Sequence, residues 1–124
     1  LLAEDHELNS EIATALLEEQ GASITAVENG RLALEAIQNA APHTYDAILM
    51  DVMMPEMNGL EATRCIRAFE GKGPGEGTPI IAMTANVFAD DVKACLDAGM
   101  NSHVGKPLDM KVLIGEILKY TDAH

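Results

Sequence analysis

The sequence is short of basic side chains, cysteine and long apolar runs, and each shortage excludes a class of protein. Eight Lys and Arg stand against twenty Asp and Glu among 124 residues, a formal net charge of −12, so sequence-independent binding to nucleic acid phosphates is not expected. Two cysteines without CxxC spacing indicate free thiols in a reducing compartment. No apolar run approaches the ~20 residues of a membrane-spanning helix, and no targeting segment is visible. We therefore expect a cytoplasmic protein without direct membrane contact.

Hydrophobic residues, in contrast, make up 48% of the chain. That fraction is too high for a disordered segment. The length predicts one domain over residues 1–124, which needs no disulfide or metal ion to fold. The chain opens directly on the apolar Leu1 rather than on Met. We expect a domain cut from a longer protein, with its first strand truncated at the N-terminus.

Five short apolar runs alternate with longer segments whose apolar residues recur every three to four positions. The runs, at 1–3, 24–27, 47–50, 79–83 and 102–104, are typical of strands buried on both faces of a parallel sheet. The intervening stripes predict helices that pack on that sheet. They consist of Leu8, Ile12 and Leu16, then Leu32, Ala33, Ala36, Ile37 and Ala40, then Ala62, Cys65, Ile66 and Phe69, then Phe88, Val92, Cys95 and Leu96, and finally Val112, Leu113, Ile117 and Leu118. The pattern predicts an α/β fold, a five-stranded parallel sheet flanked by helices on both faces.

Polar side chains follow four of the predicted strands. Glu4 and Asp5 follow the first, Asp51 the third, Thr84 the fourth and Lys106, closely, the fifth. In open parallel sheets the carboxyl ends of the strands form the ligand-binding edge. Carboxylates meeting there at ~4 Å would repel by roughly 4 kcal/mol per pair, so the site must keep a proton or bind a cation, and Mg²⁺ suits its oxygen ligands. A carboxylate nucleophile, a metal, a lysine and a hydroxyl together indicate phosphoryl transfer.

Other features have structural interpretations. The segment 71–77, GKGPGEG, lacks the GxxxxGK[ST] pattern of a phosphate-binding loop and is expected to be a flexible connection. Cys65 and Cys95 lie on helical stripes and are expected to pack as small hydrophobic residues. Pro55 and the Asn58-Gly59 pair are expected to shape a turn after Asp51.

Four fragments, in this order and at these separations, resemble the response-regulator receiver domains of two-component signalling over essentially the whole chain. LLAED ends on the acidic pair, ILMDVMMPEMNG contains Asp51, PIIAMTA contains Thr84, and GKP places Lys106 before Pro107. The resemblance implies the flavodoxin-like receiver fold, with strand order 2-1-3-4-5.

The resemblance also implies a phosphorelay function. A histidine kinase or a histidine phosphotransfer domain would donate a phosphoryl group from phosphohistidine to Asp51, which would later lose it to water by slow autodephosphorylation. The domain would then be a phosphoacceptor and not a turnover enzyme. Asp5, Asp51 and the backbone carbonyl of Met53 would ligate Mg²⁺, with Glu4 acting mainly through metal-bound water.

The same resemblance implies a conformational switch. Thr84 and Lys106 would contact the phosphoryl oxygens, and the peptide bond before Pro107 would be cis. On phosphorylation Thr84 would move toward the phosphoryl group while an aromatic side chain on the fifth strand turns inward. His103 stands where the family usually has Tyr or Phe, so it is either a half-buried strand residue or a source of pH sensitivity. His6, beside the acidic pair, either helps to start the first helix or binds metal.

The fragments MTANVFADDV and NSHVGKP resemble receivers attached to hybrid sensor histidine kinases. Such a parent could place the domain on the cytoplasmic side of a membrane-anchored sensor, and the surface formed by the fourth helix, fifth strand and fifth helix would be the family's usual output face, open to a dimer or an intramolecular contact. No basic helix-turn-helix follows the last helix, so direct DNA binding is not expected. The alternatives are the receiver of a stand-alone or effector-linked regulator, an inactive pseudo-receiver, and a Mg²⁺-dependent phosphohydrolase. The last would need a general acid where Met53 stands.

Overall fold

The computed structural model describes residues 1–5, 7–19, 21, 23–40, 45, 47–52, 57–71, 77–84, 89–105 and 110–121. Within these residues five strands alternate with five helices. In chain order they are β1 (Leu2–Ala3), α1 (Glu7–Glu19), β2 (Ala26–Val27), α2 (Gly30–Asn39), β3 (Ile48–Asp51), α3 (Gly59–Glu70), β4 (Ile80–Thr84), α4 (Ala89–Ala98), β5 (Ser102–Gly105) and α5 (Met110–Thr121). Each predicted strand and helix is present.

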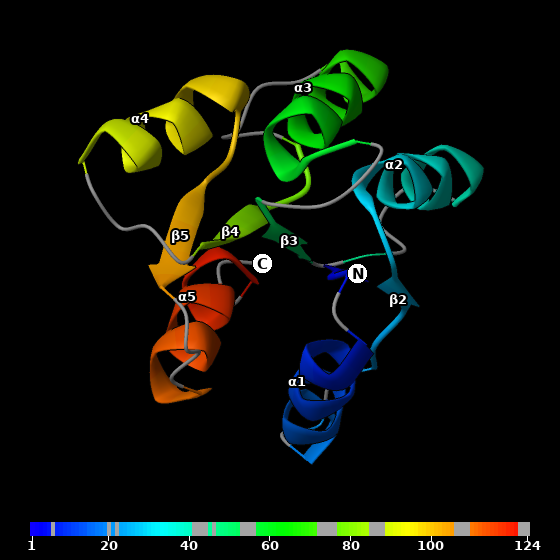
Figure 1. The fold of residues 1–124 in the computed structure, drawn as a ribbon, viewed down its shortest axis with the longest axis vertical. Coiled ribbons are helices and arrows are strands. Elements are labelled where there is room, and N and C mark those ends of the chain that lie inside the picture. Colours follow the sequence, from blue (N-terminus) through cyan, green and yellow to red (C-terminus); the bar gives the residue numbers. More distant parts are fainter. Residues whose placement is uncertain are drawn as a thin grey trace.

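The strands form one parallel sheet in the order β2-β1-β3-β4-β5. Helices cover both of its faces, with α1 and α5 on one side and α2, α3 and α4 on the other (Figure 1). The fold class and the strand order expected from the resemblance are therefore confirmed. The middle strands β1 and β3 are buried throughout, whereas the edge strands β2 and β5 are partly exposed.

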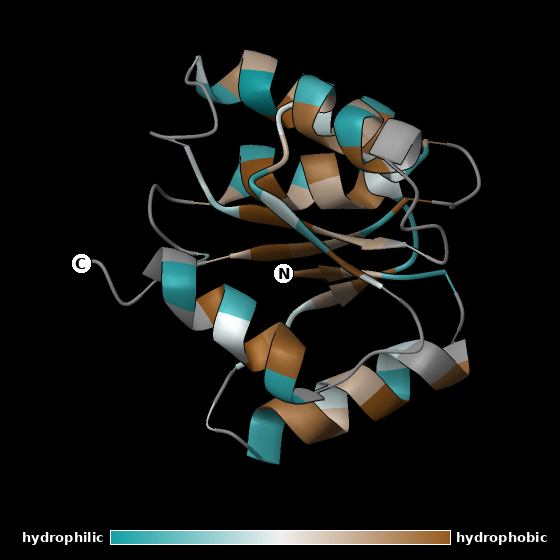
Figure 2. Ribbon diagram, turned by 90° about the vertical axis from the view of Figure 1, so that its left-hand side faces the viewer, coloured by the Kyte–Doolittle hydropathy of each residue, from teal (hydrophilic) through white to brown (hydrophobic). Residues whose placement is uncertain are grey.

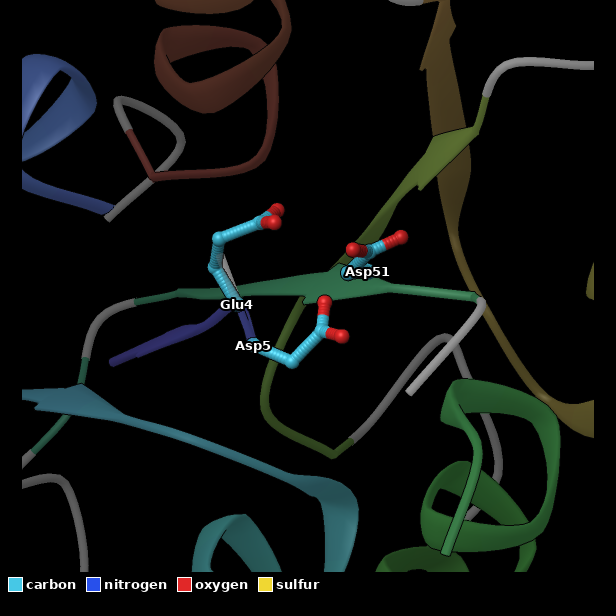
Figure 3. Close-up of side chains that lie close together, drawn as sticks. All are labelled: Glu4, Asp5 and Asp51. Atoms are coloured by element: carbon cyan, nitrogen blue, oxygen red, sulfur yellow. The ribbon is translucent and has the colours of Figure 1, made fainter. Parts of the chain in front are cut away.

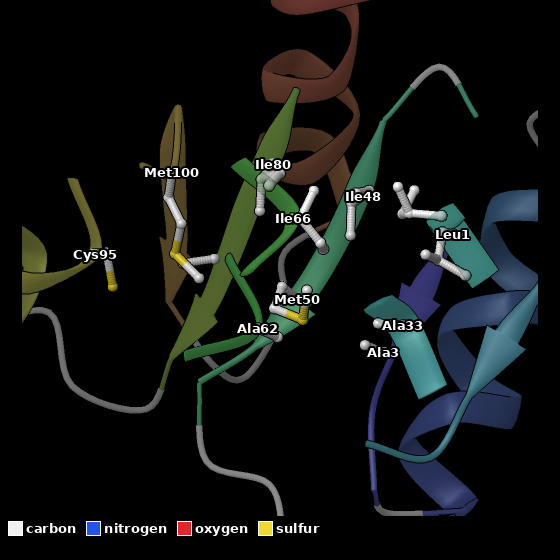
Figure 4. Close-up of a cluster of buried hydrophobic side chains, with 12 residues drawn as sticks. Leu1, Ala3, Ala33, Ile48, Met50, Ala62, Ile66, Ile80, Cys95 and Met100 are labelled. Carbon is white, nitrogen blue, oxygen red and sulfur yellow. The ribbon is translucent and has the colours of Figure 1, made fainter. Parts of the chain in front are cut away.

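The sheet separates two hydrophobic clusters, and alternate residues of each middle strand enter different clusters. In β3, Ile48 and Met50 pack toward α2, α3 and α4, while Leu49 packs toward α1 and α5. The first cluster, shown in Figure 4, also contains Ala33 of α2 and Ile66 of α3. Figure 2 shows the apolar strands lying between the helical layers. The continuous apolar runs arise because both strand faces are covered.

Helix α1 is oriented differently from the prediction. Its stripe of Leu8, Ile12 and Leu16 is 67%, 50% and 38% exposed, whereas Ala13 and Leu17 are buried against the sheet. The expectation that the stripe forms the packed face was wrong. The apolar arc of this helix is broader than one face, and the helix packs through the neighbouring stripe, one residue further along and so about 100° around the axis. An apolar strip of α1 is left at the surface.

Three other stripe residues are also exposed. Phe69, Leu96 and Val112 are 52%, 48% and 52% exposed, and each lies within one turn of a helix end. Of the two free thiols, Cys95 is buried, as expected, and Cys65 is half-buried. No helix in the described part of the chain is long and apolar enough to cross a membrane.

A buried arginine joins α3 to the amino ends of β4 and β5. The Arg67 side chain is 9% exposed. It donates hydrogen bonds to the carbonyl oxygens of Gly99 and Thr78, at 2.9 and 2.8 Å, to Asn101 Oδ1 at 2.8 Å and to Glu70 Oε1 at 2.9 Å. This network fastens the edge of the sheet opposite to the strand ends that carry the acidic residues.

Candidate functional site

Three carboxylates meet at the carboxyl edge of the sheet. Glu4, Asp5 and Asp51 each offer an oxygen atom, and these atoms lie within 4.8 Å of one another. Figure 3 shows Glu4 and Asp5 at the end of β1 beside Asp51 at the end of β3. Glu4 and Asp51 are both 4% exposed, and Asp5 is exposed. The site is therefore anchored in the fold and accessible from one side.

Strand pairing brings these residues together although Glu4 and Asp51 are far apart in sequence. β1 and β3 are neighbours, and Ala3 lies opposite Met50, so the next residue of each strand is an acidic one. The Glu4 N–H also donates to the Val27 carbonyl oxygen at 3.1 Å, which ties the end of β1 to β2. Because parallel strands end at the same edge, a carboxylate that follows each of two adjacent strands is placed in a common site.

The electrostatics of this cluster favour a bound cation. At 4.8 Å and an effective dielectric of about 20, each pair of ionised carboxylates repels by roughly 3.5 kcal/mol. A hard divalent ion such as Mg²⁺ relieves this repulsion and prefers carboxylate oxygen ligands with several retained waters. The partial exposure of the cluster leaves room for such waters on the Asp5 side. The donor set therefore fits Mg²⁺.

The remaining predicted site residues are only partly described. Thr84 is the last residue of β4 and lies opposite Gly105, the last residue of β5, and Lys106 follows Gly105 in the sequence. Lys106 itself lies outside the described residues, as do Met53, Pro107 and His6, and the 72–76 part of the glycine-rich segment. Their roles stay predictions.

His103 is half-buried in β5, where it pairs with Ala82 of β4. This placement agrees with its interpretation as a half-buried strand residue. An influence of His103 on the switch would be a difference between the unphosphorylated and phosphorylated states, so this role stays a prediction.

Two Asn-Gly pairs mark the starts of the helices α2 and α3. Of the residues expected to shape the turn after Asp51, Pro55 lies outside the described residues, and Asn58 begins a helix: its Oδ1 accepts a hydrogen bond from the Glu61 N–H at 2.9 Å and so caps α3. Asn29 caps α2 in the same way and precedes Gly30. The second pair, which lies far from the acidic residues in sequence, was not singled out.

Comparison with known proteins agrees with this arrangement. The family model of the response regulator receiver domain matches residues 1–118. Probable histidine kinase 1 of Oryza sativa subsp. indica is 40% identical over 139 aligned positions, which cover 90% of this chain and 14% of that protein. The chain thus spans only a small part of this curated relative.

Two solved structures resemble the whole domain. The receiver domain of the sensor histidine kinase PA1611 from Pseudomonas aeruginosa PAO1, which has a magnesium ion coordinated in its active site cleft, superimposes with a TM-score of 0.84 at 36% identity, covering 98% of this chain and 94% of that one. The receiver domain of the Saccharomyces cerevisiae response regulator Ssk1, in complex with the histidine phosphotransfer protein Ypd1, gives 0.85 at 27% identity, covering 98% and 86%. With this fold, this family match and this identity, the chain belongs to the response-regulator receiver-domain family.

Proposed function

We propose that residues 1–124 form a single phosphoacceptor domain in which Asp51 receives a phosphoryl group from phosphohistidine. The observation that carries the proposal is the cluster of Glu4, Asp5 and Asp51 at the carboxyl edge of a receiver fold. Of these three, Asp51 lies on the central strand β3, between the strands that carry the other predicted site residues. It is therefore the carboxylate with neighbours on both sides.

Mg²⁺ is the cation that these ligands suit. Asp5, Asp51 and the backbone carbonyl of Met53 would hold it, and Glu4 would act mainly through a water molecule. When bound, the ion supplies positive charge that neutralises the carboxylates and the phosphoryl oxygens. The magnesium ion in the cleft of the Pseudomonas aeruginosa domain supports this assignment.

In the transfer step a carboxylate oxygen of Asp51 attacks the phosphorus atom of the donor's phosphohistidine. The new O–P bond forms as the P–N bond breaks, and the imidazole nitrogen leaves with the electron pair of that bond and takes up a proton. Later, water attacks the aspartyl phosphate and releases inorganic phosphate, which restores the Asp51 carboxylate. The domain thus stores the phosphoryl group for a limited time.

Two residues at the ends of neighbouring strands would bind the transferred group. The Thr84 hydroxyl and the Lys106 ammonium group would donate hydrogen bonds to its oxygens. Since β4 and β5 pair at Thr84 and Gly105, a movement of Thr84 toward the phosphoryl group would be felt at β5, where His103 lies. This route would couple phosphorylation to the surface formed by α4, β5 and α5.

Phosphorylation by a small-molecule donor tests the assignment of Asp51. Incubation with acetyl phosphate and Mg²⁺ should add one base-labile phosphoryl group, measured by intact mass. The addition should disappear in Asp51→Asn and persist in the matched control Asp97→Asn, an exposed carboxylate of α4. Continuous turnover of phosphate esters would support a phosphohydrolase instead. Absence of any modification in the unsubstituted chain would support an inactive pseudo-receiver.

The exposed strip of α1 is a suitable docking surface for the phosphodonor protein. The helix begins at Glu7, two residues after Asp5, and the exposure of Leu8, Ile12 and Leu16 decreases with distance from the site, from 67% to 50% to 38%. Exposed apolar surface next to a reaction site is typical of a partner contact. A donor that delivers phosphohistidine to Asp51 must cover the rim of the site, and the complex of Ypd1 with the Ssk1 receiver supports a histidine phosphotransfer domain as such a donor.

A comparison of two donors tests this docking surface. In a Leu8→Ser/Ile12→Ser double variant, phosphotransfer from a phosphorylated histidine phosphotransfer protein such as Ypd1 should slow by about ten-fold or more. Phosphorylation by acetyl phosphate should be unchanged because it needs no docking. Val112→Ser, at an equally exposed apolar position of α5, should affect neither reaction. Equal rates of transfer from the protein donor in all forms would contradict the assignment.

We further propose that the chain is the receiver module of a hybrid sensor histidine kinase, with the module on the cytoplasmic side. The kinase relative of which it covers 14% and the receiver of the Pseudomonas kinase support this parent over a stand-alone or effector-linked regulator. The coding sequence on either side of the chain decides between them, since a hybrid kinase must encode a phosphorylated histidine and an ATP-binding domain. Sedimentation before and after phosphorylation would show whether the domain forms a dimer.

A further inference from the structure

Two buried glycines connect helix α2 to the acidic site by way of the start of α3. Gly30 is the first residue of α2 and Gly59 the first of α3. Each follows an asparagine that caps its helix, Asn29 or Asn58. The two helix starts are therefore built alike, and they pack against each other.

At Gly30 the backbone of α2 touches the backbone before α3. The Gly30 N–H donates a hydrogen bond to the Met57 carbonyl oxygen at 3.0 Å. A side chain at this position would overlap that same oxygen, and its Cβ would lie 2.8 Å from Ala62 Cβ and 3.1 Å from the Asn58 carbonyl oxygen. Since the atoms met are backbone atoms and a short core side chain, they cannot rotate away. Any residue larger than glycine must displace the start of α3.

At Gly59 the start of α3 rests on the peptide group of Asp51. The Gly59 N–H donates to the Val52 carbonyl oxygen at 3.0 Å. A Cβ here would overlap the Asp51 carbonyl oxygen and lie 3.0 Å from Met50 Cγ. A displacement of α3 is therefore transmitted to the backbone that carries the proposed phosphoacceptor.

We propose that Gly30 is a positioning residue for the carboxylate site. By admitting the Met57 carbonyl oxygen, it sets the point at which α3 begins, and through Gly59 it holds the backbone of Asp51 in register with Glu4 and Asp5. The inference rests on the proposed function, in which these carboxylates bind Mg²⁺. Magnesium demands near-ideal ligand geometry, so groups that orient its ligands affect its affinity without touching it.

The test is a Mg²⁺ titration of Gly30→Ala, followed through the backbone amide NMR signals of Asp51 and Val52. These signals report the site in folded molecules, so a change in the folded fraction does not alter the measured Kd. The control is Gly99→Ala, where an added Cβ would meet Arg67 Cγ at 2.9 Å and the backbone has φ +112°. This variant is also strained, but at the opposite edge of the sheet.

In Gly30→Ala the Kd for Mg²⁺ should rise about ten-fold or more, whereas in Gly99→Ala it should stay within about two-fold of the unsubstituted value. If either variant is unfolded in plain buffer, all three forms are measured in trimethylamine N-oxide, which favours the compact state. An unchanged Kd in Gly30→Ala, or an equal rise in Gly99→Ala, would overturn the inference. Failure of the unsubstituted chain to bind Mg²⁺ would overturn the proposed function on which it rests.

Discussion

Replacing Arg67 with methionine should destabilise the domain by about 3–4 kcal/mol. The side chain is 9% exposed and donates four hydrogen bonds, to Gly99, Thr78, Asn101 and Glu70. A hydrogen bond to a charged group contributes roughly 1.5–3 kcal/mol, but these four share one side chain and their contributions do not add. Loss of one partner of a buried ion pair typically costs about 3–5 kcal/mol. Methionine refills part of the volume, which favours the lower part of that range.

Urea unfolding at neutral pH, followed by circular dichroism, measures the change. Against a total stability of about 5–15 kcal/mol for a domain, the predicted loss moves the midpoint substantially. The matched control is Arg64→Met, an exposed arginine of the same helix, which should change the free energy of unfolding by less than about 0.5 kcal/mol.

The free energy of unfolding of Arg67→Lys should fall between those of Arg67→Met and Arg64→Met, because an ammonium group keeps the charge but cannot reproduce the fork of the guanidinium group. If Arg67→Met lowered the free energy of unfolding by less than about 1 kcal/mol relative to Arg64→Met, the reasoning would be refuted. It would mean that the network forms without holding the edge of the sheet.

Three further predictions concern charge and capping. Burial tends to raise the pKa of Glu70, but hydrogen bonds from the Thr78 hydroxyl and N–H and from Arg67 outweigh it and lower the pKa below its usual 4.5. The free energy of unfolding should therefore fall as the pH drops below that value, because the Glu70 carboxylate then takes up a proton. In Glu70→Gln this pH-dependent loss should be missing from the acid unfolding profile. Asp51→Asn removes one of three mutually repelling carboxylates and should raise the free energy of unfolding without Mg²⁺ by at least about 1 kcal/mol. Mg²⁺ should raise the melting temperature of the unsubstituted chain, and it should raise that of Asp51→Asn by less. Asn58→Ala removes the cap of α3 and should cost about 1 kcal/mol in the same unfolding assay, and no loss would show that the cap is dispensable.

The order of elements and the position of the acidic site could be predicted from local sequence. Runs such as 47–50 and 79–83 are apolar at every position because both faces of a middle strand are covered. Glu4, Asp5 and Asp51 interrupt the pattern where the strands end, and parallel strands end at one edge. The position of the carboxylates at strand ends and the common edge of parallel strands together predict that the three carboxylates lie close to one another.

The orientation of α1 could not be predicted in this way. Periodicity shows that a helix has an apolar face, but two adjacent stripes satisfied the period, one with Leu8, Ile12 and Leu16 and one with Ala13 and Leu17. The choice between them depends on how closely the helix can approach the sheet. Burial of the small Ala13 beside Leu17 allows a close approach, whereas Leu8, Ile12 and Leu16 remain partly outside.

The sequence by itself thus determined the kind of fold and the chemical groups at the carboxyl edge of the sheet. Both depend on the local composition of the strands and on the residues at which the strands end. Only the tertiary structure decided which faces stay open and which side chains hold the framework. Arg67 is a charged residue on a helix, and nothing local indicates that it is buried among acceptors from two distant segments, Thr78 before β4 and Gly99 and Asn101 before β5. Gly30 lies far from Asp51 in sequence, and its contact with Met57 exists only because α2 and α3 pack side by side. Contacts of this kind are set by packing between elements, which no single segment encodes.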